Sequence, residues 1–175
     1  SLEHPGVLVQ HGPILRVVFG SRNPSYISPI LSAIQSDLCE SGIDGVLSTH
    51  IQRDALEKFS YVSPIGAAGV YLHAVAGDFQ KEGPARELFK SMIREISALA
   101  AAMGYPFEKD YVKINLEILS NLSADATTSM QRDIMEGKPS ELDGLVMEPL
   151  RLAKKYSVSM PCYEEVANAL CPLEF

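Results

Sequence analysis

The fold is decided by a stretch that reads Thr127-Thr128-Ser129-Met130-Gln131-Arg132-Asp133-Ile134 and, two residues later, Gly137-Lys138-Pro139-Ser140-Glu141-Leu142-Asp143. It predicts a short helix, a tight break and a longer helix. Gly137 can end the first helix in the left-handed conformation, and Ser140 can cap the second. The resulting corner would hold several hydroxyls and the Glu141 carboxylate close together. Two well-capped helices with solvated charges explain the same residues equally well.

Composition narrows the class of protein. The chain has 175 residues, enough for one domain or for a domain and a fragment of another. Its net charge of −7 argues against a nucleic-acid binder, which needs a basic face. The sequence contains neither an apolar run of membrane-spanning length nor a signal pattern. Cysteines 39, 162 and 171 have no metal-ligand spacing, so we expect free thiols, no metal site and a cytoplasmic protein.

The first third of the chain predicts a small αβ segment. Apolar residues alternate over residues 6–20 around a turn at His11-Gly12-Pro13, which is typical of a hairpin. A helix over Ser28–Cys39 and a strand over Asp44–His50 follow. We therefore expect a β-β-α-β segment over residues 1–50.

The rest of the chain, residues 51–175, has a helical period and predicts a second, all-helical domain. A kink or break is expected at Pro64, and Pro149 lies in a helix interior, where proline costs about 3 kcal/mol unless its surroundings compensate. The small residues Gly66-Ala67-Ala68-Gly69 leave room for another backbone or for a ligand. The expected helices are 52–74, 84–103, 108–122, the two of the corner (the second reaching Tyr156), and one starting at Pro161.

Several motifs resemble one known family. Thr128-Ser129-Met130-x-x-Asp133-Ile134 and Gly137-Lys138-Pro139-x-Glu141-Leu142-Asp143 look like the signature of the C-terminal substrate domain of ketopantoate reductases (2-dehydropantoate 2-reductases). Glu57-Lys58-Phe59 and Met160-Pro161 match the same family in order and approximate spacing. The resemblance implies a mainly α (α+β) fold, with an all-helical substrate and dimerisation domain of the 6-phosphogluconate-dehydrogenase C-terminal-like type. A short β-hairpin/αβ fragment from the end of a Rossmann domain would precede it.

The resemblance also implies which residues form the active site. Reduction of a 2-oxo acid places negative charge on the carbonyl oxygen, so a lysine acid is suitable chemistry. Lys58 is implied as this general acid, although Asp54 four residues earlier also permits an ordinary surface ion pair. Glu141 is implied as a second catalytic residue close to the lysine and the cofactor. Ser129 would bind the substrate carboxylate, and Ser63 is the nearest polar substitute for a further substrate-binding group.

The chain departs from the family at four positions. Family members carry asparagines, which help to hold the hydroxylated, gem-dimethyl substrate, where this chain has Val62, Gly66, Ala76 and Ala126. The reductase chemistry is therefore better supported than ketopantoate itself. A different branched or aromatic 2-oxo acid remains an alternative substrate.

The cofactor implied by the resemblance is NADPH, but the sequence contains no G-x-G-x-x-G after a strand. We expect the N-terminal Rossmann domain of such reductases to be missing from this chain, so that the chain alone neither binds a dinucleotide tightly nor turns over. The unpaired strand edges of the hairpin would then favour a homodimer.

Two hypotheses follow. The first is the substrate-binding and catalytic half of an NADPH-dependent 2-oxo acid reductase, most simply 2-dehydropantoate 2-reductase, which converts ketopantoate to pantoate in pantothenate biosynthesis. The second is a non-catalytic helical dimerisation or ligand-binding module that retains the reductase scaffold.

Overall fold

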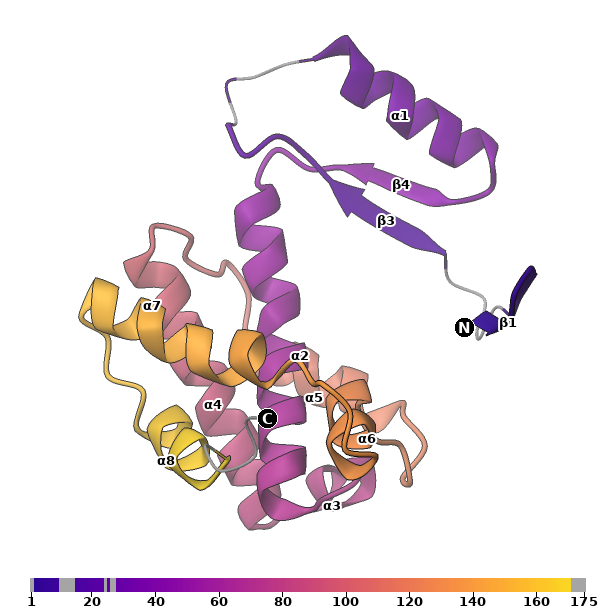
Figure 1. Ribbon diagram of the computed structural model, residues 1–175. Coiled ribbons are helices and arrows are strands. Elements are labelled where there is room, and N and C mark those ends of the chain that lie inside the picture. Colours follow the sequence, from indigo (N-terminus) through magenta and orange to yellow (C-terminus); the bar gives the residue numbers. More distant parts are fainter. Residues whose placement is uncertain (1, 10–14, 24, 26–27, 171–175) are drawn as a thin grey trace. The chain divides into compact units, whose positions relative to one another are not determined.

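The computed structural model of the protein describes residues 2–9, 15–23, 25 and 28–170. The chain divides into two compact units, residues 1–54 and residues 55–175 (Figure 1). Helices dominate the described residues, and the few strands all lie before residue 48, which confirms the predicted fold class. None of the helices in these ranges combines the length and the apolar character needed to cross a membrane.

The first unit contains two pairs of strands. Strand β1 (Leu2–His4) pairs antiparallel with β2 (Val7–Leu8). Strand β3 (Arg16–Phe19) pairs with β4 (Asp44–Leu47) in parallel, and helix α1 (Pro29–Glu40) connects them. A parallel pair requires such a crossover because its two strands start at the same edge. The result is one β-α-β unit beside a very short hairpin.

The hairpin predicted over residues 6–20 is wrong in its pairing. The partner of β2 is β1, across a turn in which Gly6 has a φ of +85°. The partner of β3 is β4. Alternation of apolar residues indicates a strand but does not say which other strand it joins. The expected turn, His11-Gly12-Pro13, lies outside the described residues.

Helix α1 packs closely on β4, and its ends follow local rules. Pro29 occupies the first turn, where its missing N–H costs nothing, and Gly42 has a φ of +77° just after the helix. The amide Nε2 of Gln35 donates to the carbonyl oxygen of Gly45 at 3.0 Å. A Cβ on Gly45 would lie 2.9 Å from Cβ of Leu38, so glycine permits this close approach. The predicted helix over Ser28–Cys39 is confirmed.

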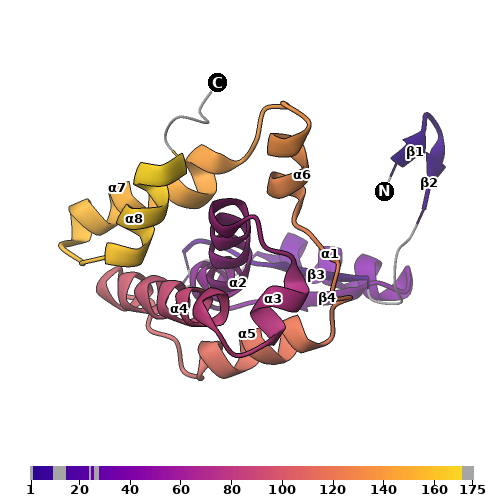
Figure 2. The ribbon, with the colours of Figure 1, turned by 90° about the horizontal axis from the view of Figure 1, so that it is seen from below.

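The second unit is a group of helices around α2, which runs through their middle in both views (Figures 1 and 2). Residues 63–70 of α2 are all buried, as expected for a helix covered on every side. The first turn of α2 belongs to the other unit. The elements are α2 (Ile51–Leu72), α3 (Ala76–Gln80), α4 (Pro84–Ala102), α5 (Tyr111–Ser120), α6 (Ser129–Met135), the π-helical turn η1 (Asp143–Met147), α7 (Glu148–Tyr156) and α8 (Pro161–Leu170).

Helix α2 continues across Pro64, so of the expected kink or break the break is wrong and the kink stays a prediction. Proline at this position denies an N–H to the carbonyl of Ser60, four residues earlier. The side chain of Asn115 on α5 replaces it, because Nδ2 donates to the Ser60 carbonyl oxygen and to Ser60 Oγ, both at 3.0 Å. Asn115 is only 1% exposed. A buried amide from another helix therefore compensates for the proline.

Pro149 is compensated in the same way. It denies an N–H to the carbonyl of Leu145, in the π-helical turn η1. The hydroxyl of Ser63 on α2 donates to that carbonyl oxygen at 2.5 Å. Since the only proton of Ser63 is used there, the hydroxyl of Tyr163, 2.5 Å away, must donate to Ser63 Oγ. Burial raises the pKa of Tyr163, which keeps this donor protonated.

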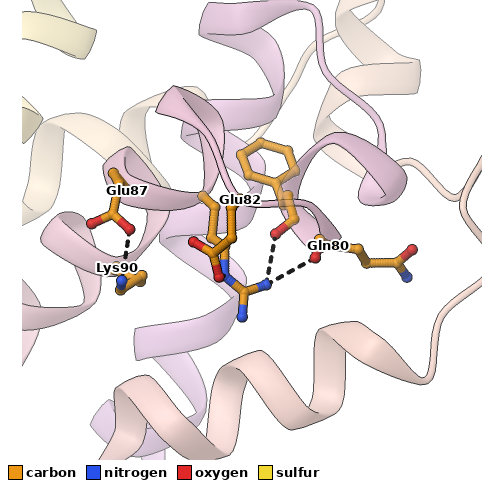
Figure 3. Close-up of polar contacts among 6 residues, drawn as sticks. Gln80, Glu82, Glu87 and Lys90 are labelled. Carbon is orange, nitrogen blue, oxygen red and sulfur yellow. Dashed lines mark hydrogen bonds and ion pairs between the residues drawn. The ribbon is translucent and has the colours of Figure 1, made fainter.

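The connection between α3 and α4 is held by one arginine (Figure 3). A guanidinium nitrogen of Arg86 donates to the carbonyl oxygens of Phe79 and Gln80, at 3.2 and 3.1 Å. These carbonyls end α3 and have no partner inside the helix. Arg86 also pairs with Glu82 at 3.3 Å. One side chain therefore fixes the end of α3 against α4.

Candidate functional site

Helix α6 begins with a capping box. The side chain of Thr128 accepts a hydrogen bond from the backbone N–H of Gln131 at 3.2 Å, and Gln131 Oε1 accepts from the N–H of Thr128 at 2.9 Å. Part of the hydroxyl run at 127–129 therefore caps a helix. The spacing of Thr and Gln three residues apart is a sequence signature of this cap that our prediction missed. Ser140, in contrast, does not cap the next helix, since the residue preceding η1 is Leu142.

Gln131 also ties α6 to α2. Its Nε2 donates to the carbonyl oxygen of Ala74 at 2.8 Å. A Cβ on Gly69 would lie 2.7 Å from Cδ of Gln131, and one on Gly66 would lie 3.1 Å from Cε of Met130. The small residues of α2 thus make room for the side chains of α6.

A pocket of about 180 Å³ lies beside the start of α6. Its wall is mostly apolar, and its polar side chains are those of Tyr61, Thr127, Thr128 and Gln131. The remaining wall residues are Ile65, Ala74, Ala76, Phe79, Leu122 and Ala126. Ala76 and Ala126, which stand where the family resemblance implies asparagines, are therefore both exposed to this cavity.

Among the described residues, Tyr61 has the one buried side-chain polar atom without a hydrogen-bond partner. Its hydroxyl oxygen is buried and has no hydrogen-bond partner among them. The ring packs edge-on against Phe89, with the two centroids 6.0 Å apart. Burial raises the pKa of Tyr61, so the phenol is protonated and can donate at neutral pH. Sequence reasoning missed this residue, although its position three after Lys58 was available.

Lys58 is exposed on α2, one turn before Tyr61. The spacing of Lys58, Tyr61 and Ile65 is i, i+3, i+7, which places the three residues along one face of the helix. Tyr61 and Ile65 line the pocket. The Lys58 ammonium makes no ion pair within the described part of the second unit. A flexible cation is therefore carried on the pocket's own face of α2.

Ser129 directly follows residues of the pocket wall in the sequence, whereas Glu141 does not. Ser129 is the first residue of α6, exposed, and follows directly on the wall residues Thr127 and Thr128. The side chain of Glu141 is exposed just before η1, and its carbonyl accepts from the N–H of Leu145 at 2.8 Å. Glu141 forms no part of the pocket wall. Its expected place close to Lys58 stays a prediction.

Ser63 is fully buried, and both of its hydrogen bonds are made inside the chain, to Leu145 and Tyr163. Because the side chain is buried, a substrate could reach this hydroxyl only if the surrounding residues moved. The substrate-binding role expected for Ser63 stays a prediction, and its described role is to support the proline-containing turn.

A second pocket, of about 230 Å³, lies between α2, α4 and α7. It is almost wholly apolar and contains one carboxylate, that of Glu148, among its wall residues. Its other wall residues are Ala55, Leu56, Phe59, Ile96, Leu99, Gly144, Pro149 and Leu152. With a single polar side chain, it offers fewer groups that could orient a substrate than the pocket beside α6.

Three glycines of the described residues face protein atoms and leave no open space for a phosphate. A Cβ on Gly20, directly after β3, would lie 2.3 Å from the carbonyl oxygen of Ser48, so this glycine faces backbone and not open space for a phosphate. Gly66 and Gly69 face side chains of α6. In the same ranges, no group of three or more acidic, histidine or cysteine side chains could hold a metal ion.

The described cysteines, Cys39 and Cys162, are free. Burial, together with the nearby Glu95 carboxylate, raises the pKa of Cys162 to about 11, so its thiol stays protonated at neutral pH. Such a thiol is a poor nucleophile. Cys171 lies outside the described residues. Cys162 is therefore not a candidate for covalent catalysis.

Comparison with known proteins identifies one family. The family model "Ketopantoate reductase PanE/ApbA C terminal" matches residues 50–174. An uncharacterized oxidoreductase, YkpB of Bacillus subtilis (strain 168), is 22% identical over 166 residues, which are 95% of this chain and 54% of that protein.

Solved structures show the same fold. The 2-dehydropantoate 2-reductase of Methylococcus capsulatus superimposes with a TM-score of 0.81 at 23% identity, over 93% of this chain and 52% of that one. The dimeric ketopantoate reductase of Staphylococcus aureus superimposes with a TM-score of 0.80 at 17% identity, over 92% of this chain and 54% of that one. A D-mandelate dehydrogenase with NADH and anilino(oxo)acetate superimposes with a TM-score of 0.77 at 16% identity, over 90% of this chain and 66% of that one. The chain spans about half the length of the first relatives it matches.

Proposed function

Because this chain belongs to the ketopantoate reductase C-terminal family, we propose that it supplies the substrate-binding and proton-donating part of a nicotinamide-dependent 2-oxo acid reductase. The substrate proposed first is ketopantoate, reduced to pantoate, with NADPH as the cofactor. The observation that carries the proposal is the pocket beside α6, since Lys58 and Ser129 stand next to residues of its wall.

Lys58 is the proposed general acid. When the carbonyl carbon of the substrate accepts hydride, its oxygen gains negative charge and takes a proton from the Lys58 ammonium. The products are the 2-hydroxy acid and a neutral lysine, which regains its proton from water. A positioned acid of this kind typically accelerates a reaction 10²–10⁴-fold. The exposure of Lys58 allows it to recover the proton between turnovers.

Ser129 and Glu141 have proposed supporting roles. The Ser129 hydroxyl would donate to the substrate carboxylate and set the direction from which the carbonyl faces Lys58. The Glu141 carboxylate, if it approaches Lys58 and the cofactor, would favour the charged form of the lysine. The hydride would come from the nicotinamide, and Glu141 is the one described residue that we place beside the cofactor.

A homodimer is proposed for the assembly. It is supported by the dimeric ketopantoate reductase of Staphylococcus aureus, which has the same fold. Large apolar side chains of the first unit are also exposed, with Leu8 at 82% and Ile30 at 68%. Exposed apolar residues in small sheets of two short strands, whose outer edges have no strand partner among the described residues, are typical of surfaces that pair with another chain.

The test is Lys58→Ala in the complete gene product, assayed for reduction of ketopantoate with NADPH and with NADH. We expect kcat to fall by about two to four orders of magnitude, while the melting temperature stays unchanged because Lys58 is exposed. Lys109→Ala, which removes another exposed lysine, is the matched control and should keep full activity. Activity that survives Lys58→Ala would refute the role of Lys58 as the general acid. Absence of any reduction by the wild-type protein would favour the non-catalytic binding module.

A further inference from the structure

The π-helical turn η1 is held by side chains on both of its sides. Turns of this kind are rare and occur frequently at functional sites. On the buried side, the hydroxyl of Ser63 donates to the carbonyl oxygen of Leu145, and the hydroxyl of Tyr163 donates to Ser63. On the surface, the guanidinium of Arg151 binds both carboxylate oxygens of Asp143 at 2.8 Å. Side chains from α2, α7 and α8 therefore stabilise this one turn.

The turn sets the direction of the residues that precede it. A π-helical turn contains one residue more than an α-helical turn, and one residue corresponds to about 100° of rotation about a helix axis. If η1 became α-helical, Glu141 and Leu142 would therefore rotate by about 100° relative to α7. Leu142 is only 2% exposed, so this rotation would remove it from the core. The π-helical form thus fixes where the chain at Glu141 points.

Glu141 is connected to α2 through this turn. Its carbonyl oxygen accepts from the N–H of Leu145 at 2.8 Å, and the carbonyl oxygen of the same Leu145 accepts from Ser63. Ser63 lies five residues after Lys58 on α2. One hydrogen-bonded path therefore joins the helix that carries the proposed acid to the backbone of the second proposed catalytic residue.

We propose that Ser63 and Tyr163 are positioning residues for Glu141. By fixing the π-helical turn, they hold the backbone of Glu141 at one place and in one direction relative to α2, so that its carboxylate can approach Lys58 and the cofactor. In this role Ser63 needs no contact with a substrate, and neither hydroxyl takes part in the proton transfer. This inference rests on the proposed function and adds to it the residues that place Glu141.

A purely structural role predicts a different result. If Ser63 only stabilises the fold, loss of its hydroxyl changes turnover by the same factor whether or not the Glu141 carboxylate is present. If Ser63 acts through Glu141, its loss has no further effect once that carboxylate has been removed. The two substitutions are then non-additive in kcat, which a double-mutant cycle measures directly.

The experiment is this cycle in the complete protein, with kcat and KM for the reduction of ketopantoate by NADPH. Ser63→Ala should lower kcat about five- to tenfold, as expected for one lost hydrogen bond, and leave KM within about twofold. In the Glu141→Gln background it should change kcat less than about twofold. Tyr163→Phe, which keeps the ring, completes the same cycle if Ser63→Ala does not fold, and should show the same pattern with a smaller loss.

The matched control is Ser97→Ala. It removes a partly buried hydroxyl on α4 that donates to the carbonyl of Ile93 at 2.9 Å, so it also deletes one internal hydrogen bond but has no link to η1. It should leave kcat unchanged in both backgrounds. Amide hydrogen exchange gives a second measurement that needs no activity: Ser63→Ala should speed exchange of the Leu145 N–H about five- to tenfold, and Ser97→Ala should not.

The outcomes separate this inference from the proposed function. If reduction depends on Lys58 but the losses from Ser63→Ala and Glu141→Gln multiply, the inference is overturned and the proposed function stands. An unchanged kcat in both Ser63→Ala and Tyr163→Phe, or an unchanged exchange rate at Leu145, would overturn it in the same way. Absence of any reduction by the wild-type protein would refute the proposed function, and the inference would fall with it.

Discussion

The side-chain amide of Asn115 should contribute measurably to the free energy of unfolding, because it replaces a hydrogen bond that Pro64 removes. Asn115→Ala deletes two contacts of 3.0 Å and leaves the carbonyl of Ser60 buried without a donor. An unsatisfied buried group costs about 1–3 kcal/mol, so we expect the free energy of unfolding to fall by about 2 kcal/mol. The small cavity left by the truncation adds to this value.

A double-mutant cycle isolates the part that belongs to the proline. Pro64→Ala restores a backbone N–H four residues after Ser60, where it can donate to the orphaned carbonyl. Asn115→Ala should therefore cost about 1 kcal/mol less in the Pro64→Ala background than in the wild type. The cavity and any change of helix propensity cancel in this difference.

The assay is urea unfolding followed by far-ultraviolet circular dichroism, since the chain has no tryptophan to report by fluorescence. Four proteins are compared: the wild type, each single variant and the double variant. A cost for Asn115→Ala that is the same in both backgrounds to within about 0.3 kcal/mol would refute the reasoning, because the two residues would then not share a carbonyl.

Two further predictions concern single hydrogen bonds. Tyr163→Phe should lower the free energy of unfolding by about 1 kcal/mol, since the Tyr163 hydroxyl donates to Ser63. Tyr61→Phe should not lower it, because the Tyr61 hydroxyl has no partner in the described chain. Thermal melts of both variants test this, and equal losses would contradict it. The hydrogen-bonded Arg151 lowers the pKa of Asp143, so the pair stabilises the folded state above the unfolded-state pKa of about 4 and loses this effect as the pH falls through the lower, folded-state value. Asp143→Asn should therefore lower the melting temperature at neutral pH and hardly at all in strong acid, and a loss independent of pH would show that the pair contributes nothing.

The helices with local signals could be predicted from the sequence. Pro84 and Gly104 enclose α4, and Gly104 adopts a φ of +90°. Gly137 has a φ of +66° after α6, as the corner required. These signals involve residues close in sequence, so they can be read without knowing the fold.

What could not be predicted depends on partners far along the chain. The continuity of α2 across Pro64 requires Asn115, 55 residues from Ser60, and the turn at Pro149 requires Ser63. The partner of β3 lies beyond α1. Propensity rules count a proline as a break because they do not include a side chain that arrives from another helix.

The roles of Lys58 and Ser129 stay predictions. Thr127 and Thr128 of the Thr-Thr-Ser run line the pocket beside α6, and Lys58 precedes the wall residue Tyr61 by one helical turn, but the sequence motifs alone did not define this pocket. Tyr61 was missed because a tyrosine at helical spacing is indistinguishable from a core residue until its hydroxyl is seen to lack a partner. Whether Glu141 approaches Lys58 depends on side chains that are free to move at the surface.

The contact between Gly69 and Gln131 limits the order in which these two positions can change during evolution. Helix propensity alone favours alanine over glycine at position 69 by about 1 kcal/mol. A Cβ there would lie 2.7 Å from Cδ of Gln131, so the amide would have to move and give up its hydrogen bonds unless position 131 had first lost its long side chain. That loss in turn opens the cap at Thr128 and frees the carbonyl of Ala74. Each first step is therefore harmful alone, and the two positions are expected to change together or not at all.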